Sequence, residues 1–465
     1  MPDRAAPLSA VELLAAYRSR ELSPVEATAA MLERIERDDA DLNAFCLLDG
    51  ERALAEARAS EARWQRGEPA GALDGVPVGV KDILLTRGWP TLRGSRAVDP
   101  AGPWEDDAPV VAALRRNGAV LPGKTTTPEI GWKGVTDSAL EGITRNPWDR
   151  ERTPGGSSGG SAAALSAGMV PLALGTDGGG SIRIPCGFSG LVGLKPTYGR
   201  VPAWPASPFG AVAHLGPMAR TVADAALLLD VMAEPDARDW VALPPPTTSF
   251  LAGLEDGVEG LRIAFSPDLG HVQVDPEVAG AVARAAFGFA ALGAHVEQLD
   301  PGFEDPRGTF DVLWSAGAAH ALAGLGDPAP ETLDPGLVEM AAAGRSHGVL
   351  DYLAAIGRRD RLAIEMSRFH EHWDLLLTPT LPLPAFAAGR EVPDGWPDPR
   401  WPSWTPFTYP FNLTQQPAAS VPCGFTAAGL PIGLQIVGPR YGDAMVLRAA
   451  RAYEAAHPQP TLAPR

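Results

Sequence analysis

Residues 153–202 read TPGGSSGGSAAALSAGMVPLALGTDGGGSIRIPCGFSGLVGLKPTYGRVP, and this run is the most informative in the chain. Its residues 161–170 are small and apolar, which predicts a tightly packed, buried helix. The following segment, PLALGTD, has the apolar run of a buried strand and leads into the loop GGGS at 178–181. The run therefore predicts a buried helix followed by a strand that ends in a glycine loop.

On both sides of this run, strands and helices are predicted to alternate. Short apolar runs that end in glycine or polar residues begin at residue 71 with GALDGVPVGVKDILL, as in strands that enter loops. GLRIAFSPD (260–268) and HVEQLD (295–300) are predicted strands on either side of an Ala-rich helix at 276–292, and three more apolar runs follow between 374 and 438. This alternation predicts an α/β fold with a mixed central β-sheet covered by helices on both faces.

Two segments are predicted to be mainly helical. Ser9 with Glu12, and Ser23 with Glu26, match the capping box that begins a helix, so we expect a helical N-terminal arm over about 1–66. Residues about 303–372 are Ala-rich and are predicted to form a variable helical region. No internal repeat is visible at periods of 20 to 50 residues, and residues 1–465 are expected to form a single domain.

Composition restricts the partners of the protein. The net charge is −17, and such a field repels phosphate backbones and anionic membranes, so we expect neither a nucleic-acid nor a membrane partner. The long uncharged stretches 153–176 and 401–439 are interrupted by prolines, which argues against membrane-spanning helices.

The cysteines indicate the redox state of the cellular compartment. Cys46, Cys186 and Cys423 form neither a disulfide framework nor a zinc-binding spacing, and the first twenty residues lack the apolar core of a signal peptide. These features predict a reducing, cytoplasmic setting.

Three formal motif matches have simpler explanations. GAVLPGKT (118–125) fits the phosphate-binding loop pattern, but its central residues look like a strand and Pro122 has no amide to donate. GGSSG (155–159) fits the nucleophile elbow of Ser-His-Asp hydrolases, but a loop precedes it where that motif needs an apolar strand. His370 and His372 are two residues apart, which is typical of a solvated helix end. We therefore expect no metal and no nucleotide at these positions.

Lysine is rare in this chain, which draws attention to each one. Only four of the 39 basic residues are lysines: Lys81, Lys124, Lys133 and Lys195. Lysine, unlike arginine, can lose its proton in a protein. Lys81 ends the apolar strand GVPVGV, where desolvation would lower its pKa toward neutrality. The alternative is a structural lysine paired with Asp82.

Glycine and serine concentrate at two places after this lysine. Consecutive glycines before Ser181 would let the backbone amides of 178–181 converge on one point, as an oxyanion site requires. The second cluster is GGSSGGS at 155–161. Each cluster alone is better explained by a flexible turn. A candidate base, two serine clusters and an amide nest within about 100 residues together favour a catalytic site.

These segments resemble the amidase signature family. The resemblance rests on GVPVGVKD, on the run 153–202 and on PAASVPCGF with GLPIGLQIVG, and it extends from about residue 10 to 455. It implies the amidase signature fold and a Ser-cisSer-Lys triad, with Lys81 as base, Ser157 as bridging serine after a cis peptide and Ser181 as nucleophile. Other positions match the family's oxyanion hole (Gly178, Gly179, Gly180) and the residues that support its triad (Ser158, Asp177, Arg183).

The resemblance also implies a mechanism. Neutral Lys81 would draw a proton through Ser157 from Ser181, which attacks the amide carbonyl and forms an acyl-enzyme that water hydrolyses. No cofactor is implied. The expected partner is a small-molecule amide, and the expected state is a monomer or homodimer.

Residues 393–411, PDGWPDPRWPSWTPFTYPF, place aromatic residues between six prolines. Stiff aromatic loops suit the wall of a pocket for an apolar or aryl substrate, although a loop clamped onto the core by its aromatics is equally well supported. The candidate pocket residues are three from this segment and two near the catalytic segments: Trp404, Phe407, Tyr409, Trp89 and Trp132. The substrates predicted from this are aryl or hydrophobic amides, with related esters or carbamates as further candidates.

An alternative function is that of the glutaminase-like subunit of a glutamyl-tRNA amidotransferase, which acts only within an assembly. Two features count against it. The segment AWPASPFGAVAHLGPMAR (203–220) lacks the SSLDQ-like stretch associated with that subunit, and the acidic charge disfavours direct contact with tRNA.

Overall fold

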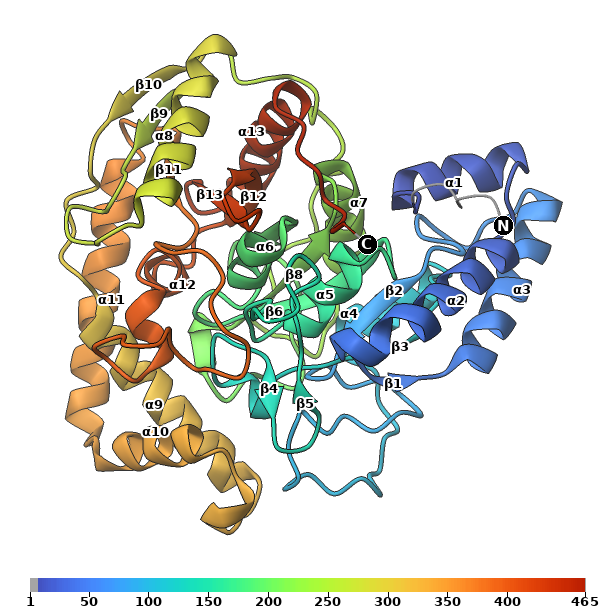
Figure 1. Ribbon diagram of the computed structural model, residues 1–465, viewed down its shortest axis with the longest axis horizontal. Helices are drawn as coiled ribbons and strands as arrows, with labels where there is room; N and C mark the ends of the chain where they lie inside the picture. The colour runs from blue at the N-terminus through green and yellow to red at the C-terminus, as the bar shows by residue number, and fades with distance from the viewer. Residues whose placement is uncertain (1–6, 465) are drawn as a thin grey trace.

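The computed structural model describes residues 7–464 and places them around a mixed β-sheet of eleven strands (Figure 1). The strands are β1 (Phe45–Leu48), β2 (Val78–Lys81), β3 (Gly123–Thr125), β6 (Leu172–Asp177), β7 (Val192–Lys195), β8 (His214–Ala219), β9 (Arg262–Phe265), β10 (His295–Gln298), β11 (Leu375–Pro379), β12 (Ala418–Phe425) and β13 (Pro431–Val437). Their order in the sheet is β1-β3-β2-β6-β8-β7-β12-β13-β11-β9-β10. Two short strands, β4 (Asp137–Ser138) and β5 (Gly142–Ile143), pair separately.

Parallel and antiparallel pairs are both present in the large sheet. β2 is parallel to β3 and β6, and β9 is parallel to β10 and β11. The central pairs from β6 through β8, β7, β12 and β13 to β11 are antiparallel, as is β1 with β3. The predicted mixed sheet is therefore confirmed.

Helices cover both faces of this sheet. They are α1 (Ala10–Ser19), α2 (Pro24–Leu42), α3 (Gly50–Arg66), α4 (Pro109–Arg116), α5 (Gly159–Ser166), α6 (Arg183–Ser189), α7 (Val222–Met232), α8 (Pro276–Ala291), α9 (Arg307–Gly324), α10 (Pro335–Ser346), α11 (Val349–Phe369), α12 (Tyr409–Leu413) and α13 (Asp443–Ala456). Figure 1 shows α1–α3 on one side of the molecule and α9–α11 on the opposite side.

Alternation along the strands assigns the helices to faces. In β11, Leu375 and Leu377 belong to the core formed with α1, α4, α7, α8 and α13, whereas Leu376 belongs to the core formed with α9 to α12. Successive strand residues point to opposite sides, so these two cores lie on opposite faces of the sheet. A third core joins α2, α5 and α6 around Ala173 of β6.

The N-terminal arm departs from the prediction at one element. Both capping boxes are present, with Ser9 and Ser23 accepting the backbone N–H of Glu12 and Glu26. The arm is not wholly helical, however, because β1 lies between α2 and α3 and pairs with β3 at the edge of the sheet. Residues 1–6 of the arm, and residue 465, lie outside the described residues.

The region predicted as helical over 303–372 contains α9, α10 and α11. None of the helices formed by residues 7–464 has both the length and the apolar character needed to cross a membrane.

The sheet brings Lys81 and the glycine-rich loop at 178–182 to the same end of neighbouring strands. β2 ends at Lys81 and its parallel neighbour β6 ends at Asp177, so the carboxyl ends of both strands meet on the same side. Crevices outside the carboxyl ends of parallel strands are common ligand sites. The loop at 178–182 follows β6 directly, and Ser157 and Ser158 immediately precede α5.

Candidate active site

Lys81 lies at the end of β2 with no exposed surface. Three hydroxyl oxygens surround its Nζ, which donates to Ser157 Oγ at 2.7 Å, Ser158 Oγ at 2.8 Å and Thr176 Oγ1 at 2.8 Å. Burial lowers the pKa of Lys81 well below its ordinary value, and the charge of Asp177 opposes this only in part. A neutral amine has a lone pair, so Lys81 can take a proton from one of the hydroxyls around it.

Asp82 does not serve as the partner of Lys81. Its carboxylate is instead 2.7 Å from the ammonium of Lys124, which is fully buried. Lys124 belongs to the GAVLPGKT segment, where β3 is formed, and it also donates to Thr91 Oγ1 at 2.5 Å. The structure therefore separates the roles of the two lysines: Lys124 is held by a carboxylate and Lys81 by hydroxyls.

Ser157 and Ser158 both accept from Lys81 Nζ, and Ser158 also contacts the end of β6. The peptide bond between Gly156 and Ser157 is cis. Ser158 Oγ accepts the N–H of Thr176 at 3.3 Å, and the N–H of Ser158 donates to the carbonyl of Ser181 at 3.2 Å. The bridging and nucleophile positions of the predicted triad therefore lie on segments that are hydrogen-bonded to each other.

The loop at 178–181 is glycine-rich because aromatic side chains press against it. A Cβ on Gly178 would lie 2.6 Å from the ring of Trp314, and one on Gly179 would lie 2.6 Å from the ring of Trp401. The amides of Gly178, Gly179 and Ser181 donate to no other described residue, which leaves them available for an oxyanion. The amide of Gly180 differs from the prediction, because it donates to Asp177 Oδ1 at 2.8 Å.

Asp177 and Arg183 form a fully buried ion pair beneath this loop, with Arg183 Nη2 2.9 Å from Asp177 Oδ1. Arg183 also donates to Asn412 Oδ1 at 2.6 Å and to Gln435 Oε1 at 2.8 Å. Burial would raise the pKa of Asp177, but Arg183 overrides this and holds the pKa well below its ordinary value. The network ties the glycine loop to α12 and β13.

Breaking this ion pair is expected to destabilise the protein. Arg183→Met would leave the carboxylate of Asp177 buried without a cation, and removing one partner of a buried pair costs about 3–5 kcal/mol. The free energy of unfolding in urea measures the loss. The matched control is Arg116→Met, which removes an exposed pair with Glu234 and should cost no more than about 1 kcal/mol. Equal losses in the two variants would contradict the role assigned to Arg183.

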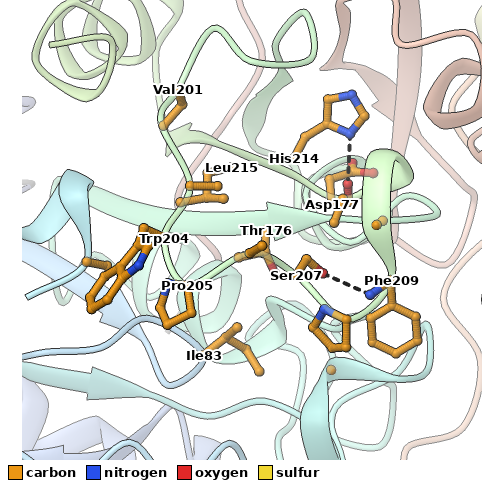
Figure 2. A pocket seen from close by; sticks show the side chains of 18 of the residues that line it. Ile83, Thr176, Asp177, Val201, Trp204, Pro205, Ser207, Phe209, His214 and Leu215 are labelled. Atoms are coloured by element: carbon orange, nitrogen blue, oxygen red, sulfur yellow. Dashed lines mark hydrogen bonds between the residues drawn. The ribbon is translucent and has the colours of Figure 1, made fainter. Parts of the chain in front are cut away.

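A cavity of about 360 Å³ opens onto Ser157 and Ser181. Figure 2 shows Trp204 and Pro205 at one end of this cavity and Phe209 at the other, with Thr176 and Ile83 between them. Phe209 stacks on Trp314, with ring centroids 4.0 Å apart. The wall is therefore largely aromatic and aliphatic, and the two serines lie within it.

None of the five aromatic residues singled out from the sequence lines this cavity. The three from the 393–411 segment are buried in the core, as in the alternative explanation of that segment: Trp404, Phe407 and Tyr409. Trp404 stacks on Phe188, and the hydroxyl of Tyr409 donates to Asp305 at 2.8 Å.

The other two aromatic candidates are also packed away from the cavity. Trp89 donates its Nε1–H to Asp49 at 3.0 Å. Trp132 is fully buried directly behind the wall, where its carbonyl accepts the indole N–H of Trp314 at 3.0 Å.

Sequence reasoning overlooked the segment that does form much of the wall. Residues 197–215 contribute Trp204 and Phe209, and α9 contributes Trp314. The run AWPASPFG carried a usable signal, since it has the same mixture of aromatics and prolines as 393–411. Trp314 stands in an Ala-rich helix, where no local pattern distinguishes a wall residue from a core residue.

Known proteins resemble this chain along nearly its whole length. The family model described as Amidase matches residues 26–447. The chain is 41% identical to a glutamyl-tRNA(Gln) amidotransferase subunit of Myxococcus xanthus (strain DK1622), with 97% of each chain covered. It is 39% identical to an acylamidase of Rhodococcus erythropolis, covering 97% of this chain and 96% of that one. A solved bacterial aryl acylamidase of the amidase signature enzymes has a TM-score of 0.91 and 32% identity, covering 99% of this chain and 98% of that chain.

Proposed function

Because this chain belongs to the amidase signature family, we propose that it hydrolyses the C–N bond of aryl or hydrophobic amides through a serine acyl-enzyme. Ser181 is the nucleophile, Ser157 relays its proton and Lys81 is the base. The observation that carries this proposal is the environment of Lys81, a buried amine with a lowered pKa and three hydroxyl partners.

The chemistry follows from where the proton can go. Neutral Lys81 takes a proton from Ser157, which in turn takes one from Ser181 as Ser181 Oγ attacks the carbonyl carbon. Negative charge then develops on the carbonyl oxygen, where the amides of Gly178, Gly179 and Ser181 can stabilise it. The proton on the relay passes to the departing nitrogen. Water attacks the acyl-enzyme by the same route and releases the acid.

The preference for aryl or hydrophobic amides rests on the cavity wall. Trp204, Phe209 and Trp314 contribute aromatic surface to the cavity that contains Ser181. Aromatic side chains favour flat apolar groups through stacking and burial, and pockets lined in this way bind apolar ligands. Esters and carbamates of similar shape are candidate substrates for the same reason.

A substrate panel tests this proposal. The purified chain is expected to release aniline from acetanilide with a higher kcat/KM than it releases ammonia from acetamide. Trp204→Ala should lower kcat/KM for acetanilide by about tenfold, since a lost aromatic contact and its buried area are together worth about 1.4 kcal/mol. Acetamide, which has no ring, is the matched control and should be affected little. Turnover of acetamide alone would contradict the proposed substrate class.

The second candidate function is that of a glutamyl-tRNA amidotransferase subunit. The 41% identity to the Myxococcus xanthus protein favours it. The aromatic wall contributed by residues 197–215 favours the first function, because glutamine has no aromatic or large apolar group to occupy it. The experiment is to assay the isolated chain with acetanilide and with glutamine, and to identify co-purifying proteins. A chain that needs partner proteins before it releases ammonia from glutamine, and that leaves acetanilide intact, would establish the second function.

A further inference from the structure

Arg93 is a cation in the candidate active-site cavity that has no side-chain partner within residues 7–464. Its residue lines the same cavity as Ser157 and Ser181. The backbone of Arg93 is fixed on both sides: its N–H donates to Asp82 Oδ2 at 2.7 Å and its carbonyl accepts the N–H of Ile130 at 2.6 Å. The side chain forms no hydrogen bond or ion pair with any other described residue, and its Nε is buried. The backbone of Arg93 is thus held in place, and its guanidinium remains free to bind a ligand.

The charges around Arg93 do not neutralise it. The carboxylate of Asp82 is already engaged by Lys124 at 2.7 Å. Asp177 is engaged by Arg183 at 2.9 Å, and Arg238 at the cavity is itself paired with Asp236 at 2.7 Å. Burial lowers the pKa of Arg93, with Asp82 opposing the shift, but a guanidinium keeps its proton at neutral pH. Asp239 also lines the cavity, but its carboxylate accepts the backbone N–H groups of Ala203 and Val241 and forms no ion pair with Arg93. Arg93 therefore remains a cation without a carboxylate partner among the described residues.

Such a charge is costly unless something pairs with it. A partly desolvated cation loses hydration that a neutral ligand does not replace, whereas a carboxylate matches the guanidinium fork with two parallel hydrogen bonds. The net charge of −17 repels anions at a distance, so an anionic ligand needs a local cation to hold it. Ile83, Leu85 and Ile130 line the same cavity, and the backbone of Ile130 is hydrogen-bonded to that of Arg93. An apolar body can therefore lie in the cavity that contains the charged group.

We infer that the preferred amide substrate carries a carboxylate, and that Arg93 binds this carboxylate while the amide carbonyl lies at Ser181. This inference rests on the proposed function, since it names the substrate class of the same site. Arg93 is in this view a specificity-determining residue and takes no part in proton transfer.

Binding without turnover tests the inference. In a Ser181→Ala background, calorimetry compares ligands that differ in charge and little in shape. One pair is 4-acetamidobenzoate and 4-nitroacetanilide, with the carboxylate on the amine side. The other is succinanilate and butyranilide, with the carboxylate on the acyl side. At least one carboxylate ligand should bind about 10- to 100-fold more tightly than its neutral counterpart, as expected for hydrogen bonds between charged groups.

Arg93→Gln should abolish that preference by weakening the binding of the carboxylate ligand alone. Arg93→Lys should retain part of the preference. The matched control is Arg87→Gln, which makes the same change in net charge at an exposed residue outside the cavity and should leave the preference intact. Absence of the preference in both ligand pairs, or equal weakening of charged and neutral ligands by Arg93→Gln, would overturn the inference. Failure of the proposed function would appear separately, as no hydrolysis of any panel amide by the chain that retains Ser181.

Discussion

Replacing Ser181 with alanine is expected to abolish amide hydrolysis, with kcat reduced by roughly 10⁴- to 10⁶-fold. Ser181 Oγ is the only protein atom that bonds covalently to the substrate in the proposed mechanism, so the acyl-enzyme cannot form without it. The remaining groups can still bind the amide and stabilise charge on its carbonyl oxygen, which sets the residual rate. Release of aniline from acetanilide measures the loss, and far-ultraviolet circular dichroism with thermal unfolding shows whether the variant is folded.

Ser207→Ala is the matched control for that experiment. Ser207 lines the same cavity, but its hydroxyl accepts the N–H of Phe209 at 3.2 Å and has no place in the proton relay. We expect its kcat to stay within a few-fold of the unaltered protein. Near-normal turnover in Ser181→Ala would refute the assignment of the nucleophile, and an equal loss in both variants would point to damage to the cavity wall.

The sequence predicted the scaffold of the candidate site well, because that scaffold depends on local pattern. The apolar runs that end at Lys81 and Asp177 are strands β2 and β6, and the small residues at 161–166 lie in helix α5. Each of these elements is recognisable within a window of ten residues or fewer. Strand β1 escaped prediction because its four residues lie between two strong helices and form a strand only by pairing with β3.

The lysines show where sequence reasoning reaches its limit. All four are buried, so the rarity of lysine did identify positions with unusual environments. The rarity of lysine could not show which of the four is the candidate base. Lys124 and Lys133 are paired with carboxylates, and Lys195 donates to the backbone carbonyls of Pro196 and Gln416. Only tertiary contacts distinguish these from Lys81 with its ring of hydroxyls.

The residues that line the cavity were harder still to predict, because their positions depend on contacts between segments far apart in the sequence. An aromatic, proline-rich loop has the same sequence signature whether it faces a cavity or the core. Residues 401–409 are held in the core by α6 and α9, whereas Trp204 and Phe209 face the cavity. The unpaired state of Arg93 among the described residues is likewise invisible in the sequence, because it is defined by the carboxylates that are already engaged by other cations.

Lys81→Met is expected to lower kcat/KM for acetanilide by roughly 10²- to 10⁴-fold through loss of the base, and by more if base and nucleophile act as a unit. Methionine occupies a volume similar to that of lysine but has no lone pair able to take the proton from Ser157. The loss should fall mainly on kcat, because Lys81 lies behind the serines and does not line the cavity. Steady-state kinetics of aniline release measures both constants.

The pH dependence separates a base from a merely structural lysine. Since burial lowers the pKa of Lys81, the neutral amine is already present well below pH 10, and kcat/KM should fall about tenfold per pH unit once the pH drops below that lowered pKa. Stability should respond in the same direction. Between the folded and unfolded pKa values the unfolded chain binds one more proton, so the free energy of unfolding rises with pH over that range. Lys81→Met should remove both this contribution and the acidic limb of the activity profile. An acidic limb that survives in the variant with unchanged midpoint would show that another group supplies the base.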